Sequence, residues 1–340
     1  MKLKKAAFIF LIFIIILSFS LRVYSLMQPI NEVEPVDIMV EIEKGMSGRA
    51  IANLLEEEGA IKSATFFYLL LRLQDLNNLQ AGYYRFSTSD SPQAIIEKLK
   101  QGDEEKFKVT IPEGFTLEEI LNRFEGLVIP EYDKELLRTA INEEISKLEL
   151  EKNINQAQIE SGLIVEPEGI IIPTTYNFPM SFEEPALAES LVDYFREQRL
   201  PLLKEAAAES DYSAYEILII ASLIEEEGKI GEEKKTIASV IYNRLAEGMP
   251  LQLDATVQYA RAERTERVLY ADLEIDSPYN TYKINKLPPT PIASPGDLAL
   301  EAAVNPAESD YLFYFAKEDG SHVFTKSYQE HLKKQRELAN

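Results

Sequence analysis

The chain opens with an unbroken apolar run behind a short basic tail. Three lysines precede sixteen residues without charge, Ala6 to Leu21. As a helix this run spans roughly 24 Å at about 1.5 Å per residue. Val23 to Leu26 extend the segment past Arg22, whose long side chain can reach back to the membrane surface. The pattern therefore predicts a membrane helix over residues 6–26 after a tail of residues 1–5.

A cleaved signal peptide is the alternative interpretation of the same start, because it also begins with basic residues. We find no convincing Ala-x-Ala cleavage site, and Val23-Tyr24-Ser25 is only a weak candidate. An uncleaved anchor is therefore favoured. Lysines before the apolar run predict a cytoplasmic N-terminus, so residues after Met27 are expected to lie outside the membrane.

Behind a linker over residues 27–35, the pattern changes to short alternating segments. Residues 36–43 alternate like a strand, and Ser47 is positioned to cap an amphipathic helix over 50–57. An apolar helix is expected over 64–73. A short strand over residues 83–86 and a helix opened by Ser91-Pro92 complete the segment, which we define as a module of residues 36–107.

The beginning of this module recurs 69 positions later in the chain. Both copies consist of a strand, a glycine turn, a hydroxyl cap and a helix, and the second copy has capping-box spacing between Thr116 and Glu119. The matching positions are Ile42, Gly45, Ser47 and Ile51 in the first copy and Ile111, Gly114, Thr116 and Ile120 in the second. A common strand-turn-helix unit that arose twice also accounts for this repeat.

The module loosely resembles the LysM-like modules found beside cell-wall enzymes. LysM modules bind N-acetylglucosamine polymers, and a purely structural spacer remains the alternative. Residues 108–165 form a connecting segment that holds the second strand-turn-helix unit. Its end, residues 131–165, is a charged, solvated helical insertion to which we assign no chemistry.

The amino-acid composition excludes several classes of binding function and catalytic group. The formal net charge of −22 makes nucleic-acid binding improbable, because the chain repels phosphates. With no cysteine, disulfides, thiolate nucleophiles and cysteine-bound metals are excluded. His322 and His331 are the only histidines, and no HExxH, GxSxG, P-loop or GxGxxG motif occurs. We expect no metal and no cofactor, which leaves carboxylates as the plentiful catalytic groups.

One apolar helix, Ile217 to Glu227, ends in three consecutive carboxylates. On a helical wheel Glu225 borders the apolar stripe that contains Ile220 and Ile224, whereas Glu226 and Glu227 point further round. Burial of one carboxyl group would raise its pKa, as a general acid needs near neutral pH. Periodicity alone also permits three carboxylates that simply end the helix in solvent.

The surrounding motifs resemble those of the endolytic murein transglycosylase family, also called YceG-like. The resemblance covers about half of the chain and rests on five motifs in the family's order. They are PEGIIIPTTYNF (Pro167–Phe178), ASLIEEEGKIGEEKKTIASVIYNRLAEGMPLQLDATVQYA (Ala221–Ala260), SPYNTYKINKLPPTPIASPG (Ser277–Gly296), NPAESDYLFYFAKEDGSHVF (Asn305–Phe324) and the late Glu330-His331.

The resemblance implies residue roles. The first glutamate of the family's S-x-x-E-x-E stretch falls on Glu225, which is thereby the expected catalytic residue. The substrate-binding residues expected from the motifs and from the chemistry of sugars are Glu168, Tyr176, Asn243, Arg244, Gln252, Asp254, Thr256, Tyr259, Tyr279, Asn280 and Tyr282. Departures from the family's pattern concern loop shape: Glu226 replaces a lysine, Ala255 a proline, and Lys286 and Thr290 replace glycines.

Each polar residue also has a plainer interpretation. The tyrosines can stack on sugar rings, yet ordinary core packing explains a single tyrosine equally well. The amide side chains can donate to N-acetyl carbonyls or can serve turns and caps. Arg244 can meet a lactyl or stem-peptide carboxylate, or can pair internally with Asp254 or Glu168. We expect His322 to be structural.

The family resemblance implies an α+β protein with an N-terminal transmembrane helix, a small LysM-like α/β module and a mixed α+β catalytic domain over residues 166–340. A helical face would carry Glu225, and a small sheet would contain Tyr311 to Phe315. The enzyme would sit in the bacterial inner membrane by a single pass, with its catalytic domain extracytoplasmic.

The implied reaction is endolytic cleavage of nascent glycan strands, between N-acetylmuramic acid and N-acetylglucosamine. Glu225 would act first as acid and then as base, leaving 1,6-anhydro ends. The alternatives are a hydrolytic muramidase and a catalytically silent wall-binding scaffold. The expected partners are peptidoglycan strands, the membrane and peptidoglycan synthases of the penicillin-binding protein class.

Overall fold

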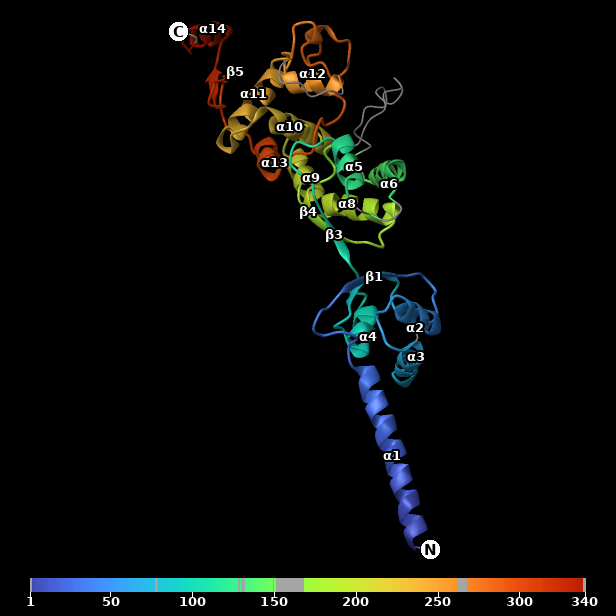
Figure 1. Ribbon diagram of the computed structural model, residues 1–340. Helices are drawn as coiled ribbons and strands as arrows, with labels where there is room; N and C mark the ends of the chain where they lie inside the picture. The colour runs from blue at the N-terminus through green and yellow to red at the C-terminus, as the bar shows by residue number, and fades with distance from the viewer. Residues whose placement is uncertain are drawn as a thin grey trace. The chain divides into compact units, whose positions relative to one another are not determined.

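A computed structural model describes residues 2–76, 79–127, 129, 132–148, 150, 168–261 and 268–338. The chain divides into two compact units (Figure 1). The first comprises Met1–Lys108 with Asn177–Phe182, and the second comprises Val109–Tyr176 with Glu183–Asn340. The α+β class is confirmed, because helices in both units accompany three two-stranded sheets in the described residues.

The first unit starts with α1 (Lys2–Met27). Its segment Lys5–Met27 has a mean hydropathy of 2.6, and this helix is long and apolar enough to cross a membrane. Large apolar side chains along it are exposed, such as Phe8, Phe13 and Phe19. A helix of this kind in water would be unfavourable, whereas lipid tails would cover it.

The rest of the first unit is a small α/β module with its own apolar core. Strand β1 pairs antiparallel with β2, and Val40 lies opposite Tyr84. Phe67 of α3 and Ile95 of α4 are fully buried in this core. Hydroxyl caps begin the helices as predicted, and the Oγ atom of Ser47 accepts the N–H of Ala50 at 3.2 Å. The elements are β1 (Asp37–Ile42), α2 (Gly48–Glu57), α3 (Ala64–Leu73), β2 (Gly82–Ser87) and α4 (Pro92–Gln101).

Strand β3 (Lys106–Thr110) and its partner β4 (Thr175–Pro179) both run across the division between the units. The predicted second strand-turn-helix unit begins with β3: the turn after it contains Gly114 at φ +76°, and Thr116 caps the next helix in a capping box with Glu119. A positive φ favours glycine there, since it lacks a Cβ atom. The repeat of the two strand-turn-helix units is therefore structural as well as sequential.

The second unit is mainly helical and is built around α10 (Ala214–Glu227). All eight residues from Ile217 to Ile224 are buried, because α9, α11, α12 and α13 pack around this helix. The prediction of one apolar stripe is therefore wrong. The other helices are α5 (Leu117–Glu125), α6 (Lys134–Ser146), α8 (Glu184–Gln198), α9 (Leu200–Ala208), α11 (Lys234–Ala246), α12 (Asp254–Ala260), α13 (Asp297–Val304) and two 3-10 turns, η2 (Gly231–Glu233) and η3 (Asp272–Glu274).

A β-hairpin and a last helix end the second unit. Strand β5 (Phe313–Ala316) pairs antiparallel with β6 (His322–Thr325), and α14 (Tyr328–Leu338) packs against both. The predicted sheet is thus confirmed, although its first strand begins two residues after Tyr311. The predicted insertion over 131–165 contains α6, and its residues 151–165 lie outside the described part of the chain.

Candidate active site

Glu225 lies near the C-terminal end of α10 and takes part in a nearly buried ion pair. Its Oε2 atom accepts the Lys234 ammonium group at 2.8 Å and the Gly296 N–H at 3.0 Å. The side chains of Glu225 and Lys234 are 9% and 6% exposed. Lys234 is the first residue of α11, and Gly296 directly precedes α13. Glu225 therefore joins three helix ends.

One turn earlier on α10, Ser222 fastens the same loop. Its hydroxyl donates to the Ile219 carbonyl at 2.7 Å and accepts the Ile292 N–H at 3.1 Å. Together with the bond from Gly296 to Glu225, this contact holds both ends of the loop from Ile292 to Gly296 against α10. The serine and first glutamate of the S-x-x-E pattern thus have an architectural function.

Glu227, the last residue of α10, has different surroundings. Its Oε2 atom accepts the Tyr314 hydroxyl at 2.9 Å. Burial raises the pKa of Glu227 to about 7, and the negative charges of Asp254 and Glu226 raise it further, against the lowering effects of the Tyr314 hydrogen bond and the Arg244 charge. This carboxyl group therefore keeps its proton to a much higher pH than an ordinary glutamate.

Two tyrosines and an aspartate border Glu227. The Tyr282 hydroxyl donates to Oδ1 of Asp254 at 2.6 Å. Burial raises the pKa of both Tyr282 and Tyr314 above the usual tyrosine value, so both hydroxyls remain donors. Asp254 begins α12 and is exposed, which leaves it open to a ligand from solvent. These contacts place the Glu227 carboxyl group close to Asp254, a polar side chain that faces solvent.

Arg244 braces this region from within the fold. Its Nε atom donates to the Leu312 carbonyl at 2.6 Å, and Nη1 donates to the Leu251 carbonyl at 2.6 Å. The guanidinium group lies 5.3 Å from the ring centre of Phe313. The buried arginine thus connects α11 to the loop before α12 and to β5. The internal ion pair with Asp254 or Glu168, one of the two alternatives for Arg244, is not among the salt bridges of the described residues.

Two of the three expected amide side chains, Asn243 and Asn280, bond to backbone carbonyls. The Asn243 amide donates to Ser309 at 2.8 Å and to Tyr311 at 2.9 Å. The fully buried Asn280 donates to Ile275 at 2.8 Å. The alternative interpretation, in which the amides stabilise turns and helix ends, therefore applies to these two side chains.

The L-Q-x-D-x-T motif divides between core and surface. Thr256 is buried, and its hydroxyl lies 2.9 Å from that of Thr281. Gln252 has a left-handed backbone with φ +53°, its N–H donates to the Thr281 carbonyl at 3.0 Å, and its side chain is exposed. Gln252 and Asp254 are thus the motif residues that face solvent.

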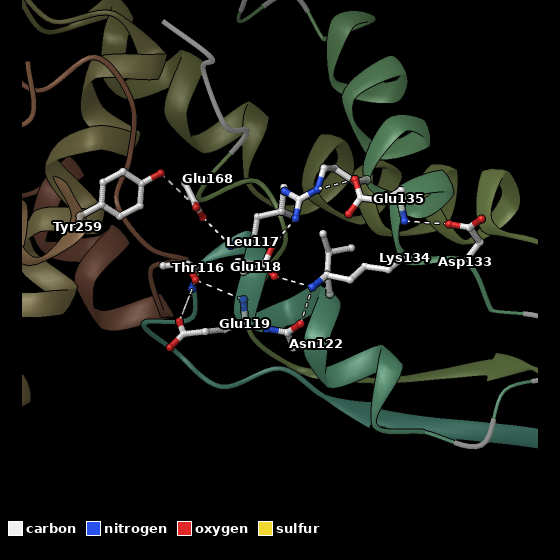
Figure 2. Close-up of polar contacts among 12 residues, drawn as sticks. Thr116, Leu117, Glu118, Glu119, Asn122, Asp133, Lys134, Glu135, Glu168 and Tyr259 are labelled. Carbon is white, nitrogen blue, oxygen red and sulfur yellow. Dashed lines mark hydrogen bonds and ion pairs between the residues drawn. The ribbon is translucent and has the colours of Figure 1, made fainter. Parts of the chain in front are cut away.

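Glu168 belongs to a second, separate group (Figure 2). Its Oε2 atom accepts the Leu117 N–H at 2.7 Å, and its Oε1 atom accepts the Tyr259 hydroxyl at 3.2 Å. The ring of Tyr259 lies 4.8 Å from that of Tyr279. Because Glu168 is 4% exposed and bonds the first residue of α5, its negative charge stabilises that helix N-terminus.

Tyr176 lies apart from both groups. Its hydroxyl donates to the Ile172 carbonyl at 2.8 Å, and its ring meets Tyr194 edge to face at 5.7 Å. At 8% exposure it is a core residue, as the alternative interpretation of single tyrosines states.

Tyr314 is the site residue that sequence reasoning missed. It lies on β5, which the sequence predicts only as an aromatic strand. His322 holds it in place: the ring of His322 meets Tyr314 edge to face at 5.4 Å, and its Nδ1 atom lies 2.7 Å from Oε2 of Glu233. The only sequence signal for a role of Tyr314 is its position within one of the five family motifs.

Comparison with known proteins agrees with this arrangement of motifs. The chain matches the YceG-like family over residues 40–337. This chain belongs to the YceG-like family. A relative from Bacillus subtilis, named endolytic murein transglycosylase, is 36% identical over 323 residues, which are 91% of this chain and 87% of that protein.

Other YceG-like relatives support the same membership. A Streptococcus pneumoniae protein of the same name is 31% identical over 353 residues, 94% of this chain and 62% of that protein. The crystal structure of a yceG-like protein from Listeria monocytogenes has a TM-score of 0.60 and 33% identity, over 88% of this chain and 99% of that one. The resemblance predicted from the five motifs is confirmed.

Proposed function

We propose that the chain is a membrane-anchored endolytic murein transglycosylase. It cleaves nascent glycan strands between N-acetylmuramic acid and N-acetylglucosamine and leaves 1,6-anhydromuramic acid ends. The observation that supports this proposal is the raised pKa of the Glu227 carboxyl group, about 7, at the end of a buried helix. The exposed carboxylate of Asp254 lies near it. The names of the Bacillus and Streptococcus relatives support the same reaction.

The chemistry requires a group that first gives and then takes a proton. Protonated Glu227 donates to the glycosidic oxygen that leaves C1 of N-acetylmuramic acid, and the neighbouring N-acetyl group stabilises the cationic centre. The ionised Glu227 then accepts the proton of the C6 hydroxyl, which closes on C1 without water. A pKa near the working pH suits both steps, because each protonation state is well populated.

Our sequence-based assignment of the acid to Glu225 stays a prediction, and the geometry favours its neighbour. Lys234 and the Gly296 N–H contact Glu225 as charge-assisted partners of a carboxylate anion. A proton donor in that position would leave the ammonium group of Lys234 buried without its counter-charge. Glu227, by contrast, accepts only a neutral hydroxyl among the contacts given above.

Substrate contacts belong, in this proposal, to the residues that border Glu227 and face solvent. Gln252 and Asp254 are exposed and can hydrogen-bond hydroxyl and N-acetyl groups. Tyr282 offers an aromatic face for a sugar ring. Arg244, Asn243, Asn280 and Thr256 then act by shaping the site rather than by binding, and Tyr176 belongs to the core.

Analysis of product ends tests the proposal. The purified full-length protein is incubated with uncrosslinked nascent strands, and the ends are identified by mass spectrometry. We expect 1,6-anhydro ends, which disappear in Glu227→Gln. Reducing ends instead would indicate a hydrolytic muramidase with Asp254 as second carboxylate. Intact strands would indicate a silent scaffold.

The anchor is proposed to keep the N-terminus in the cytoplasm and the residues after Met27 outside. The basic tail before α1 supports this orientation. Protease added to spheroplasts should then degrade the residues after Met27. Protection of the second unit, or a mature N-terminus near Leu26, would refute it.

The module over residues 36–107 is proposed to be LysM-like and to bind glycan. Its separate apolar core supports an independent binding unit. Residues 28–340 should co-sediment with purified peptidoglycan more strongly than a chain that also lacks the module. A penicillin-binding protein is the proposed synthase partner, and crosslinking in growing cells tests it.

A further inference from the structure

Helix α3 of the first unit presents an apolar face to solvent. Its other face, with Phe67 and Leu71, is buried in the module core. On the outward side, Leu69 is 53% exposed and Leu73 is 74% exposed. Phe66 lies beside them and is partly exposed. Single exposed leucines are ordinary, but one helix rarely carries apolar residues on both faces without a partner.

The segment of α3 itself lacks acidic residues. The chain has 57 acidic residues among 340, yet the sixteen residues from Gly59 to Gln74 contain none, with Glu56 to Glu58 and Asp75 directly flanking them. Two exposed basic residues, Lys62 and Arg72, stand at the two ends of the helix. An exposed apolar face flanked by lysine and arginine is typical of helices that lie in the interface of a membrane.

The start of α3 also lies next to the end of α1. The Lys62 ammonium group donates to the Ser25 carbonyl at 3.1 Å, two residues before α1 ends at Met27. Val23 and Leu26, on the last turn of α1, are partly covered. A bilayer core about 30 Å thick takes up about 20 helical residues. The end of α1, and with it the start of α3, would therefore emerge at the membrane surface.

From this juxtaposition we propose that α3 docks on the outer surface of the lipid bilayer. Leu69 and Leu73 enter the headgroup region, and Arg72 meets anionic lipid phosphates. The inference rests on the proposed membrane anchoring by α1. Its consequence is that the module is held flat against the membrane by two contacts, one spanning and one interfacial.

The absence of cysteine allows a direct test, because any single introduced cysteine is the only labelling site. Full-length protein carrying Leu69→Cys or Leu73→Cys is labelled with a polarity-sensitive fluorophore and reconstituted in vesicles with anionic lipid. Quenching is measured with lipids spin-labelled at shallow or deep positions. Leu17→Cys within α1 and Glu41→Cys on exposed β1 are the matched controls.

We expect shallow quenchers to reach the labels at positions 69 and 73, deep quenchers to reach position 17, and neither to reach position 41. Labels at 69 and 73 that behave like 41, while 17 is quenched, overturn the docking of α3 but leave the anchor intact. A label at 17 that is not quenched overturns the anchor and this inference with it.

A charge variant separates lipid docking from contact between two copies of the chain. Arg72→Gln removes one basic residue, so the ratio of docked to undocked α3 should fall roughly fivefold in anionic vesicles and little in neutral ones. Quenching or spectral shifts that depend on the ratio of protein to lipid, and not on anionic lipid, indicate a second copy as the occupant and refute the proposal.

Discussion

Two carboxylates at the same helix end have opposite surroundings. Glu225 contacts the ammonium group of Lys234 and a backbone N–H, and it ties α10 to the starts of α11 and α13. Glu227 accepts the neutral Tyr314 hydroxyl and lies near the negative charge of Asp254. They stand two positions apart in the sequence, yet one region stabilises a charge and the other favours a proton.

The difference teaches that burial alone does not make an acid. Both side chains lie against the core, but Glu225 has a cationic partner, whereas burial and the charges of Asp254 and Glu226 raise the pKa of Glu227 against the lowering effects of the Tyr314 hydrogen bond and Arg244. A carboxylate paired with a cation suits a structural contact, whereas a buried carboxyl group near negative charges keeps its proton up to a higher pH. The following predictions test this contrast.

The largest expected effect is that of Glu227→Gln on turnover. Loss of a general acid and base lowers kcat by about 10² to 10⁴-fold. Glu226→Gln is the matched control, because it removes a neighbouring carboxylate of equal size. The rate of anhydro-end formation is the measurement. If Glu225→Gln loses the rate of anhydro-end formation to this extent while Glu227→Gln stays near the parent rate, the general acid is Glu225.

The next effect is that of Glu225→Gln on stability. The substitution leaves the Lys234 ammonium group buried and unpaired, which typically costs about 3 to 5 kcal/mol. Chemical denaturation of the second unit measures the change. Adding Lys234→Met should restore part of the lost free energy. A Glu225→Gln protein as stable as the parent would show that the ion pair contributes nothing.

The pH dependence follows from the raised pKa of Glu227. In the unfolded chain this group has a pKa near 4.5, and in the folded chain about 7. The folded state therefore binds more protons between these values, so this group's contribution to stability falls as pH rises from 4.5 to 7. Activity should also fall above pH 7, as the acid form is lost. Glu227→Gln should remove the stability slope, and an unchanged slope would contradict the assignment.

The smallest effects concern the neighbours of Glu227 and have opposite signs. Tyr314→Phe removes a hydrogen bond that lowers the pKa of Glu227, so the upper limb of the pH–activity profile should move up by roughly half to one pH unit. Asp254→Asn removes a charge that raises this pKa, so the limb should move down by about a few tenths, because Asp254 is exposed and screened. Shifts of the same sign would refute this account.

Much of the fold could be predicted because local signals agreed with it. The bounds of α3 coincide with the predicted Ala64 to Leu73, since Ser63 caps a clearly apolar segment. The capping box of Thr116 and Glu119 is present as predicted. These signals depend on residues within one turn of a helix, so the sequence displays them directly.

The choice among the three carboxylates could not be predicted in this way. A helical wheel assumes one solvent-facing side, but α10 is buried all round, so its periodicity contains no information about Glu225 or Glu227. The contact that marks Glu227 comes from Tyr314, 87 positions away. Family resemblance points to this helix end, while the individual environments of the carboxylates arise only when α10, α12 and β5 come together.

The first unit is not continuous in sequence, and this affects the order in which it is made. Its last piece, Asn177–Phe182, contributes the Met180 N–H to the Glu105 carbonyl at 2.9 Å. Synthesis at about 5 to 20 residues per second delivers this piece roughly 4 to 14 s after Lys108. The first unit therefore remains incomplete while the first part of the second unit is translated.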